Sequence, residues 1–328
     1  MIAPKLKPGD ELSIVAPSKS LSILSNELVT LAADKLIELG FKVTYGRNAR
    51  TIDNFLSSPV KARVEDLHEA FLDSHVKGIL TVVGGFNTNQ MLGYIDYNIV
   101  RQNPKVVCGY SDITALTNAI YAQTGLVTYS GPYFSTFSMK KGLDYVVEYF
   151  RKCLMSEEPF EVLPSPAWSD DSWYKDQENR EFIPNDGYVV INEGEAEGII
   201  IGGNLSTFSL LQGTRYMPKP NSAVLFLEDD SFAGGRFDKV FDRYLQPIIQ
   251  QSRFENVKGI VLGRWQKGCD MNIDKLRKII STKGELKNIP VIYGVDFGHT
   301  TPLITFPIGG TVSIAAKGGK AEIKIEEH

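Results

Sequence analysis

The stretch Lys105-Val-Val-Cys-Gly-Tyr-Ser-Asp-Ile-Thr-Ala-Leu-Thr-Asn-Ala-Ile-Tyr121 passes from a short apolar run through a glycine-containing turn into a helical run. A strand followed at once by a helix is the repeating step of a parallel sheet covered by helices. At such a turn the Oγ of Ser111 would project from the carboxyl edge of the sheet, where helix amides can stabilise an oxyanion. Serine before a helix is also a common cap, and no G-x-S-x-G motif is present, so Ser111 is either a nucleophile or a cap.

The same alternation of strands and amphipathic helices runs through residues 1–155. Apolar residues at helical spacing include Leu28, Ala32 and Leu36 before the stop at Gly40, and a second helix is expected around residues 60–71. Strands are expected at Glu11 to Ala16, Lys42 to Tyr45, Ile79 to Val83 and Lys105 to Cys108. This pattern predicts an α/β fold whose N-terminal domain is a doubly wound, largely parallel sheet.

The composition changes after residue 155. Residues 156–187 are polar and punctuated by prolines, which is typical of a linker or a functional loop. Residues 188–328 predict a smaller mixed, β-rich C-terminal domain, with helices at Leu205 to Leu211 and Phe237 to Gln250 and a β-rich tail at Val291 to Ile325.

Length, charge and cysteine usage limit the classes of protein. The chain has 328 residues, 43% of them hydrophobic, and a formal net charge of -4. This length suits about two domains, and the charge argues against a nucleic acid polymer as partner. The first residues lack the apolar run of a signal peptide and no membrane span is evident, so a cytoplasmic location with no membrane partner is expected. Three widely spaced cysteines predict no disulfide framework.

The four histidines provide no metal-ligand pattern, and we expect neither a metal nor a cofactor. His68 and His75 fall on or just after an amphipathic helix and His328 is the last residue, so all three are expected to be solvated. His299 differs, because it follows a β run and stands between a glycine and a Thr-Thr-Pro turn. It is a candidate general base, although an ordinary loop histidine is the alternative.

Two further strand exits carry candidate groups. Glu228 ends the apolar run Ala-Val-Leu-Phe-Leu-Glu, where a carboxylate could orient an imidazole, but Asp229 and Asp230 compete for that role. Gly84 and Gly85 follow another strand, where they either make a tight turn or let backbone amides approach a substrate. No phosphate-binding or dinucleotide-binding glycine motif occurs.

Five segments together resemble the LD-carboxypeptidase family of serine peptidases, which includes the microcin C immunity peptidases. They are Gly-Gly-Phe-Asn-Thr-Asn at 84–89, Gly-Tyr-Ser-Asp at 109–112, Gly-Gly-Asn-Leu at 202–205, Leu-Phe-Leu-Glu at 225–228 and Gly-His-Thr at 298–300. The segments stand in the family's order and span most of the chain.

The resemblance implies a serine hydrolase with a catalytic triad at the junction of two domains. It makes Ser111 the nucleophile, His299 the base and Glu228 the orienting carboxylate. It also implies an oxyanion hole formed by the backbone amides of Gly85 and Asp112. Substrate contacts are expected at Gly84 and Asn204, and the family usually forms homodimers.

The polar loop at 156–187 favours the immunity branch of the family, because an indole near a cleft can stack on a nucleobase. Trp173 is the first candidate for this stacking and Trp168 the second. The expected substrate is a peptidyl- or aminoacyl-nucleotide, whose acyl bond would be cleaved. The alternatives are a murein tetrapeptide LD-carboxypeptidase and, in another class, a non-enzymatic small-molecule binding protein in which Ser111 is only a cap.

Overall fold

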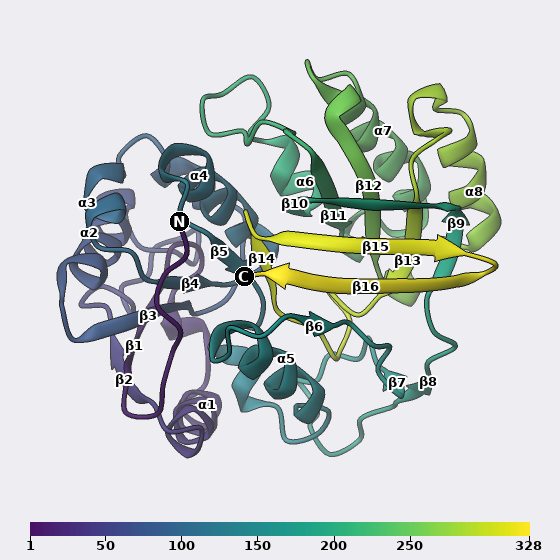
Figure 1. The fold of residues 1–328 in the computed structure, drawn as a ribbon. Coiled ribbons are helices and arrows are strands. Elements are labelled where there is room, and N and C mark those ends of the chain that lie inside the picture. The colour runs from purple at the N-terminus through teal and green to yellow at the C-terminus, as the bar shows by residue number, and fades with distance from the viewer.

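The computed structural model describes residues 1–328, and its first sheet has six strands in the order β14-β5-β4-β3-β1-β2. Strands β1 to β5 run parallel to one another, and helices flank this sheet (Figure 1). The strands are β1 Glu11–Val15, β2 Lys42–Tyr45, β3 Val76–Thr81, β4 Val106–Cys108 and β5 Thr128–Ser130. The helices are α1 Asn26–Glu38, α2 Val60–Leu72, α3 Tyr97–Gln102, α4 Thr114–Thr124 and α5 Asp144–Leu154.

The second sheet has eight strands in the order β6-β16-β15-β10-β11-β12-β13-β9. Its centre, β10 to β13, is parallel, and the outer strands pair antiparallel. The strands are β6 Phe160–Glu161, β9 Val189–Asn192, β10 Gly194–Asn204, β11 Ala223–Glu228, β12 Val257–Gly263, β13 Val291–Val295, β15 Thr311–Lys317 and β16 Lys320–Glu327. The helices are α6 Leu205–Ser209, α7 Phe237–Ile249 and α8 Ile273–Ser281. The predicted α/β class, with a parallel first sheet and a mixed second one, is confirmed.

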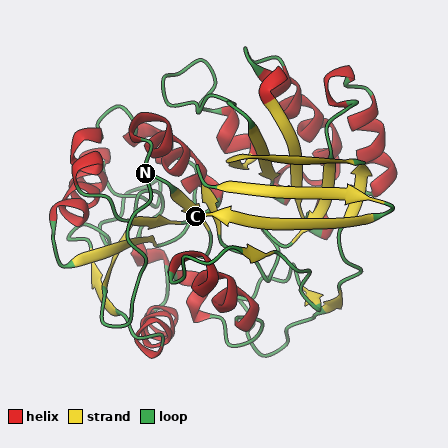
Figure 2. Ribbon diagram, in the orientation of Figure 1, coloured by secondary structure: helices red, strands yellow, loops and turns green.

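Short elements complete the chain. A small sheet joins β7 Ala167–Trp168 to β8 Ile183–Pro184, and the rest of the connection from α5 to β9 is mainly loop (Figure 2). The 3-10 turns are η1 Leu21–Ile23, η2 Thr88–Met91, η3 Ser111–Ile113, η4 Ser135–Ser138, η5 Ser231–Arg236, η6 Phe254–Asn256, η7 Lys267–Cys269 and η8 Gly284–Leu286.

Each sheet includes one strand from outside the residues that were predicted to form it. Strand β14, Phe306–Ile308, comes from the predicted C-terminal domain but pairs antiparallel with β5 of the first sheet. Strand β6 comes from the predicted linker but pairs with β16 of the second sheet. Each added strand covers an edge that would otherwise leave backbone groups unpaired. Local sequence patterns do not reveal such long-range pairing.

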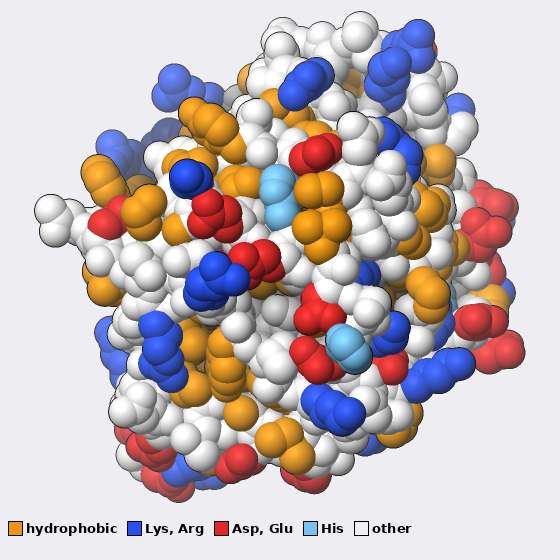
Figure 3. Space-filling model, turned by 90° about the vertical axis from the view of Figure 1, so that its left-hand side faces the viewer, with side chains coloured by type: hydrophobic (Ala, Val, Ile, Leu, Met, Phe, Trp, Pro, Cys, Tyr) orange, Lys and Arg blue, Asp and Glu red, His pale blue; other side chains and the backbone are white.

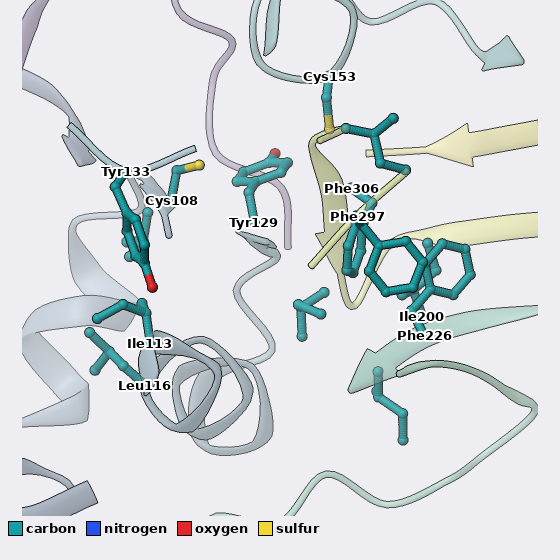
Figure 4. Packing of buried hydrophobic residues seen from close by; sticks show 14 of the residues in the cluster. Cys108, Ile113, Leu116, Tyr129, Tyr133, Cys153, Ile200, Phe226, Phe297 and Phe306 are labelled. Carbon is teal, nitrogen blue, oxygen red and sulfur yellow. The ribbon is translucent and has the colours of Figure 1, made fainter. Parts of the chain in front are cut away.

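An apolar core connects the two sheets. Phe226 of β11, Phe297 and Phe306 of β14 pack ring against ring, with centroid separations of 4.9 to 5.6 Å (Figure 4). All three side chains are buried. Since Phe297 lies two residues before His299, this packing ties the position of His299 to both sheets.

The chain termini lie side by side, and His328 is not solvated as its terminal position predicted (Figure 1). Its Nδ1 lies 2.6 Å from Nζ of Lys5 and 2.7 Å from the carbonyl oxygen of Cys153. Of the other two histidines expected to be solvated, His75 is exposed and His68 is half-buried, accepting a hydrogen bond from the amide of Asp96.

Acidic and basic side chains are interspersed on the face drawn in Figure 3. No helix combines the length and the apolar character that crossing a bilayer would require.

Candidate active site

The candidate residues gather where the carboxyl ends of the parallel strands of both sheets meet. Ser111 follows β4 and begins η3, which leads directly into α4. Its φ of 54° lies in the left-handed region, which is sparsely populated by residues other than glycine. Such strain at a strand-to-helix turn is typical of a nucleophile elbow. The N-cap residues of η3 and α4 are Tyr110 and Ile113, and neither makes a side-chain capping bond. The structure therefore does not use Ser111 as a helix cap.

A chain of two hydrogen bonds joins residues that lie far apart in the sequence. The Nε2 of His299 lies 2.9 Å from Oγ of Ser111, and its Nδ1 lies 2.7 Å from Oε2 of Glu228. Glu228 ends β11 and is buried, whereas His299 follows β13 and is partly exposed. With its proton on Nδ1, the neutral imidazole presents the Nε2 lone pair to the serine hydroxyl. This arrangement can accept the proton of an attacking serine.

Two glycines make room for the buried carboxylate. A Cβ at Gly298 would lie 2.7 Å from Oε2 of Glu228, and Gly298 has a φ of 106°. A Cβ at Gly263 would lie 2.8 Å from the Cβ of Glu228. Because larger residues would displace the carboxylate, the glycine before His299 is needed for close approach as well as for its backbone conformation.

The glycine turn after β3 lies against the serine turn. A Cβ at Gly84 would come 3.3 Å from Oγ of Ser111, so the Gly84 backbone borders the serine directly. The amide of Gly85 has no hydrogen-bond acceptor within the protein. The carboxylate of Asp112 fixes this loop by accepting hydrogen bonds from the amides of Asn87 and Thr88, each at 3.0 Å. The loop can thus present a backbone N–H beside the serine.

Asp229 occupies a different place from Glu228, although the sequence left both as candidates. Its carboxylate accepts hydrogen bonds from Nδ2 of Asn204 at 3.1 Å and from the amide and hydroxyl of Ser206. Asn204 is buried, and its Oδ1 accepts from Thr207 at the start of α6. The side chain of Asn204 therefore holds the carboxylate of Asp229 in place through a hydrogen bond.

Sequence analysis did not identify two neighbours of the serine turn. Tyr133 follows β5, and its hydroxyl donates to the carbonyl oxygen of Tyr110 at 2.7 Å, immediately before Ser111. Ser18 follows β1 and donates to Asp112 at 2.5 Å. Both stand just beyond the carboxyl ends of parallel strands, where ligand sites of open α/β sheets form. An examination of every strand exit in the sequence would have found them.

The charges around His299 alter its proton affinity. Burial by itself would lower the pKa of His299, but the carboxylate of Glu228, with Asp230 and Asp229 beyond it, raises that pKa to about 9. Burial and the neighbouring Glu228 raise the pKa of Asp229 to about 6. The base is consequently protonated over much of the neutral range.

We expect kcat/KM to rise with pH and to level off near pH 9 in a pH-rate profile. Only neutral His299 can accept the serine proton, and its fraction falls about tenfold for each pH unit below the pKa. Asp229→Asn removes one negative charge, so its rising limb should move to lower pH. A profile that is flat from pH 6 to 10, or a limb that does not move in Asp229→Asn, would contradict this account.

The loop that carries the candidate tryptophans contacts the segment that follows His299. The amides of Ser169 and Thr301 each donate to the other's carbonyl oxygen at 2.7 Å. Trp168 lies half-buried in β7, with the guanidinium of Arg264 5.1 Å from its ring centroid. Trp173 is also half-buried and packs partly on the core. These contacts place the loop beside the segment that carries His299. Neither indole forms a hydrogen bond with Ser111, Glu228 or His299, and neither pairs with the imidazole ring of His299.

No group of three or more His, Cys, Asp or Glu side chains is arranged to hold a metal ion.

Comparison with known proteins connects this geometry to one family. The profile of the LD-carboxypeptidase N-terminal domain matches residues 12–131, and that of the LD-carboxypeptidase C-terminal domain matches residues 197–314. The Bacillus subtilis protein YocD, which is named as a carboxypeptidase only provisionally, is 54% identical to this chain over the whole length of both. The microcin C7 self-immunity protein MccF of Escherichia coli is 29% identical over 100% of this chain and 96% of its own length.

Solved structures agree with these sequence matches. The crystal structure of an MccF-like protein from Bacillus anthracis has a TM-score of 0.99 at 57% identity, with both chains fully covered. The structure of MccF in complex with glutamyl sulfamoyl guanosine has a TM-score of 0.87 at 28% identity, covering 99% of this chain and 98% of that one.

Proposed function

The chain belongs to the LD-carboxypeptidase family of peptidases, and we propose that it is a serine hydrolase cleaving the acyl bond between an amino acid or peptide and a modified nucleotide. The hydrogen-bonded series Ser111, His299 and Glu228 carries the catalytic part of this proposal. The nucleotide part is supported by the tryptophan loop and by the likeness to MccF, which has been solved with glutamyl sulfamoyl guanosine and aspartyl sulfamoyl adenosine.

In the proposed mechanism, Oγ of Ser111 attacks the acyl carbonyl carbon while Nε2 of His299 takes the hydroxyl proton. Glu228 stabilises the imidazolium, and the amides of Gly85 and Asp112 donate to the oxyanion. The imidazolium then gives its proton to the leaving nitrogen, and the C–N bond breaks. Water, deprotonated by His299, attacks the acyl-serine ester and releases the acid and the free serine.

Removing the stacking indole should separate nucleotide substrates from murein peptides. A base stacked on an aromatic ring contributes about 1 to 3 kcal/mol, so Trp173→Ala should lower kcat/KM for an aminoacyl sulfamoyl adenosine roughly 5- to 150-fold. Trp168→Ala is the second candidate. Trp173→Phe, which retains an aromatic face, should lose less. Neither alanine variant should change cleavage of a murein tetrapeptide, which has no base.

The test measures kcat/KM for both substrates with wild type and the three variants. Faster cleavage of the tetrapeptide by wild type, together with unchanged nucleotide kinetics in both alanine variants, would assign the protein to murein turnover instead.

We also propose that the protein forms a homodimer, as the family resemblance implies.

A further inference from the structure

A buried tyrosine is hydrogen-bonded to the peptide that precedes the candidate nucleophile. Tyr133 is 5% exposed, and its hydroxyl donates to the carbonyl oxygen of Tyr110 at 2.7 Å. The amide of Ile113 donates to the same oxygen at 3.0 Å. This carbonyl belongs to the peptide that joins Tyr110 to Ser111. Two donors therefore fix the orientation of that peptide, one from the turn itself and one from the segment after β5.

The orientation of this peptide decides where Oγ of Ser111 points. The φ of Ser111 describes rotation about the bond from its amide nitrogen to its Cα, and its value of 54° is seldom adopted by residues other than glycine. A conformation of this kind persists only where the surrounding contacts hold it. If the carbonyl of Tyr110 were free to turn, φ could relax to a negative value and Oγ would move away from His299.

The ring of Tyr133 is connected to the base through the ring of Tyr110. The two tyrosine rings stack, with centroids 4.0 Å apart and an angle of 26° between the planes. The ring of Tyr110 in turn packs against the imidazole of His299, with centroids 5.6 Å apart and the planes at 60°. Tyr110 thus borders both the serine and the histidine, and Tyr133 contacts the carbonyl and the ring of Tyr110.

Tyr133 is itself held in place. The amide of the next residue, Phe134, donates to the carbonyl oxygen of Thr81 at 2.8 Å, at the end of β3. The amide of Ser135 donates to the carbonyl oxygen of Val82 at 3.2 Å. Burial raises the pKa of the Tyr133 phenol well above its ordinary value, so the hydroxyl keeps the proton that it donates. The parallel sheet therefore supplies a fixed donor to the serine turn.

We propose that Tyr133 is a positioning residue that holds Tyr110, through its carbonyl and its ring, in one orientation. The orientation of Tyr110 keeps Oγ of Ser111 within hydrogen-bonding distance of Nε2 of His299. This inference rests on the serine-hydrolase part of the proposed function and does not depend on the leaving group. Because the phenol acts through the serine turn, its loss should slow the attack by Ser111 and change substrate binding little.

The test measures the rate at which a fluorophosphonate modifies Ser111, together with kcat and KM. Tyr133→Phe removes only the hydroxyl. It should slow both labelling and kcat by about 10- to 100-fold, because displacing a reacting group by about 1 Å can cost about 10²-fold in rate. KM should stay near the wild-type value. Tyr129→Phe is the matched control, since Tyr129 is buried in β5 and its hydroxyl has no hydrogen-bond partner, and it should leave all three quantities unchanged.

A second variant displaces the hydroxyl instead of removing it. A Cβ at Gly84 would collide with Oη of Tyr133, and it would lie 3.2 Å from Cβ of Ser111. Gly84→Ala should therefore also slow labelling. Its effect should be smaller when it is added to Tyr133→Phe, because the colliding oxygen is then gone. Gly84→Ala alone carries the test if Tyr133→Phe does not fold.

Three outcomes would overturn the positioning role. Tyr133→Phe could be labelled at the wild-type rate with a reduced Tm, which would make the hydrogen bond merely structural. KM could rise with kcat unchanged, which would place Tyr133 in substrate binding, or Gly84→Ala could be labelled at the wild-type rate. Wild type that is not labelled at Ser111 would contradict the proposed function itself, whereas labelled wild type with unimpaired variants would contradict the positioning role alone.

Discussion

Replacing Ser111 by alanine should lower kcat by roughly 10³-fold or more, and His299→Ala should do the same. The serine supplies the attacking oxygen, and the imidazole 2.9 Å away takes its proton, so neither step proceeds without the other. Because the two groups act as one unit, the double variant should be about as slow as each single variant.

The control for this result is the integrity of the fold. Ser111 has a φ of 54°, and replacement by alanine leaves that strain in place, so the variant should melt close to wild type. Full retention of kcat in either single variant, or a double variant far slower than both, would show that Ser111 and His299 do not share a mechanism.

Glu228→Gln should lower kcat by roughly 10³- to 10⁴-fold, the loss expected when the carboxylate that orients a catalytic histidine becomes an amide. The amide cannot stabilise the imidazolium, and its NH₂ group can favour the wrong tautomer of His299. Glu228→Asp should also be slow, since the shorter side chain cannot reach Nδ1 of His299 to form the 2.7 Å hydrogen bond unless the backbone or the imidazole moves.

Asp229→Asn is the matched comparison for this prediction, because Asp229 is the adjacent carboxylate but binds Asn204 and Ser206. It should alter the pH profile far more than the maximal rate. Near-normal turnover by Glu228→Gln, with loss of turnover in Asp229→Asn or in Asp230→Asn, would transfer the orienting role away from Glu228.

The strand-exit pattern made much of the site predictable from the sequence. Ser111 and His299 each follow an apolar run that predicts a strand, and the carboxyl ends of parallel strands share one edge. The sequence alone could not decide whether Glu228 or Asp229 orients the imidazole, because only the folded structure shows which of the two adjacent carboxylates faces it. Hydrogen bonding assigns Nδ1 of His299 to Glu228.

Features set by distant contacts were not predictable. Strand β14 belongs to the first sheet because Phe306 to Ile308 pair with Ser130 to Thr128 of β5, and no local pattern encodes a pairing over so long a stretch of chain. His328 is buried because Lys5 and Cys153 are folded against it. The contact of Phe86 with Phe232 likewise exists only once both sheets are in place.

Labelling with a fluorophosphonate, followed by peptide mapping, tests the central claim most directly, namely that Ser111 is a nucleophile activated by His299. The reagent should inactivate wild type with one adduct, located on Ser111, and should leave His299→Ala unlabelled at that position. An enzyme that hydrolyses its substrate while Ser111 remains unmodified at saturating reagent, or that loses activity through an adduct elsewhere, would contradict the account.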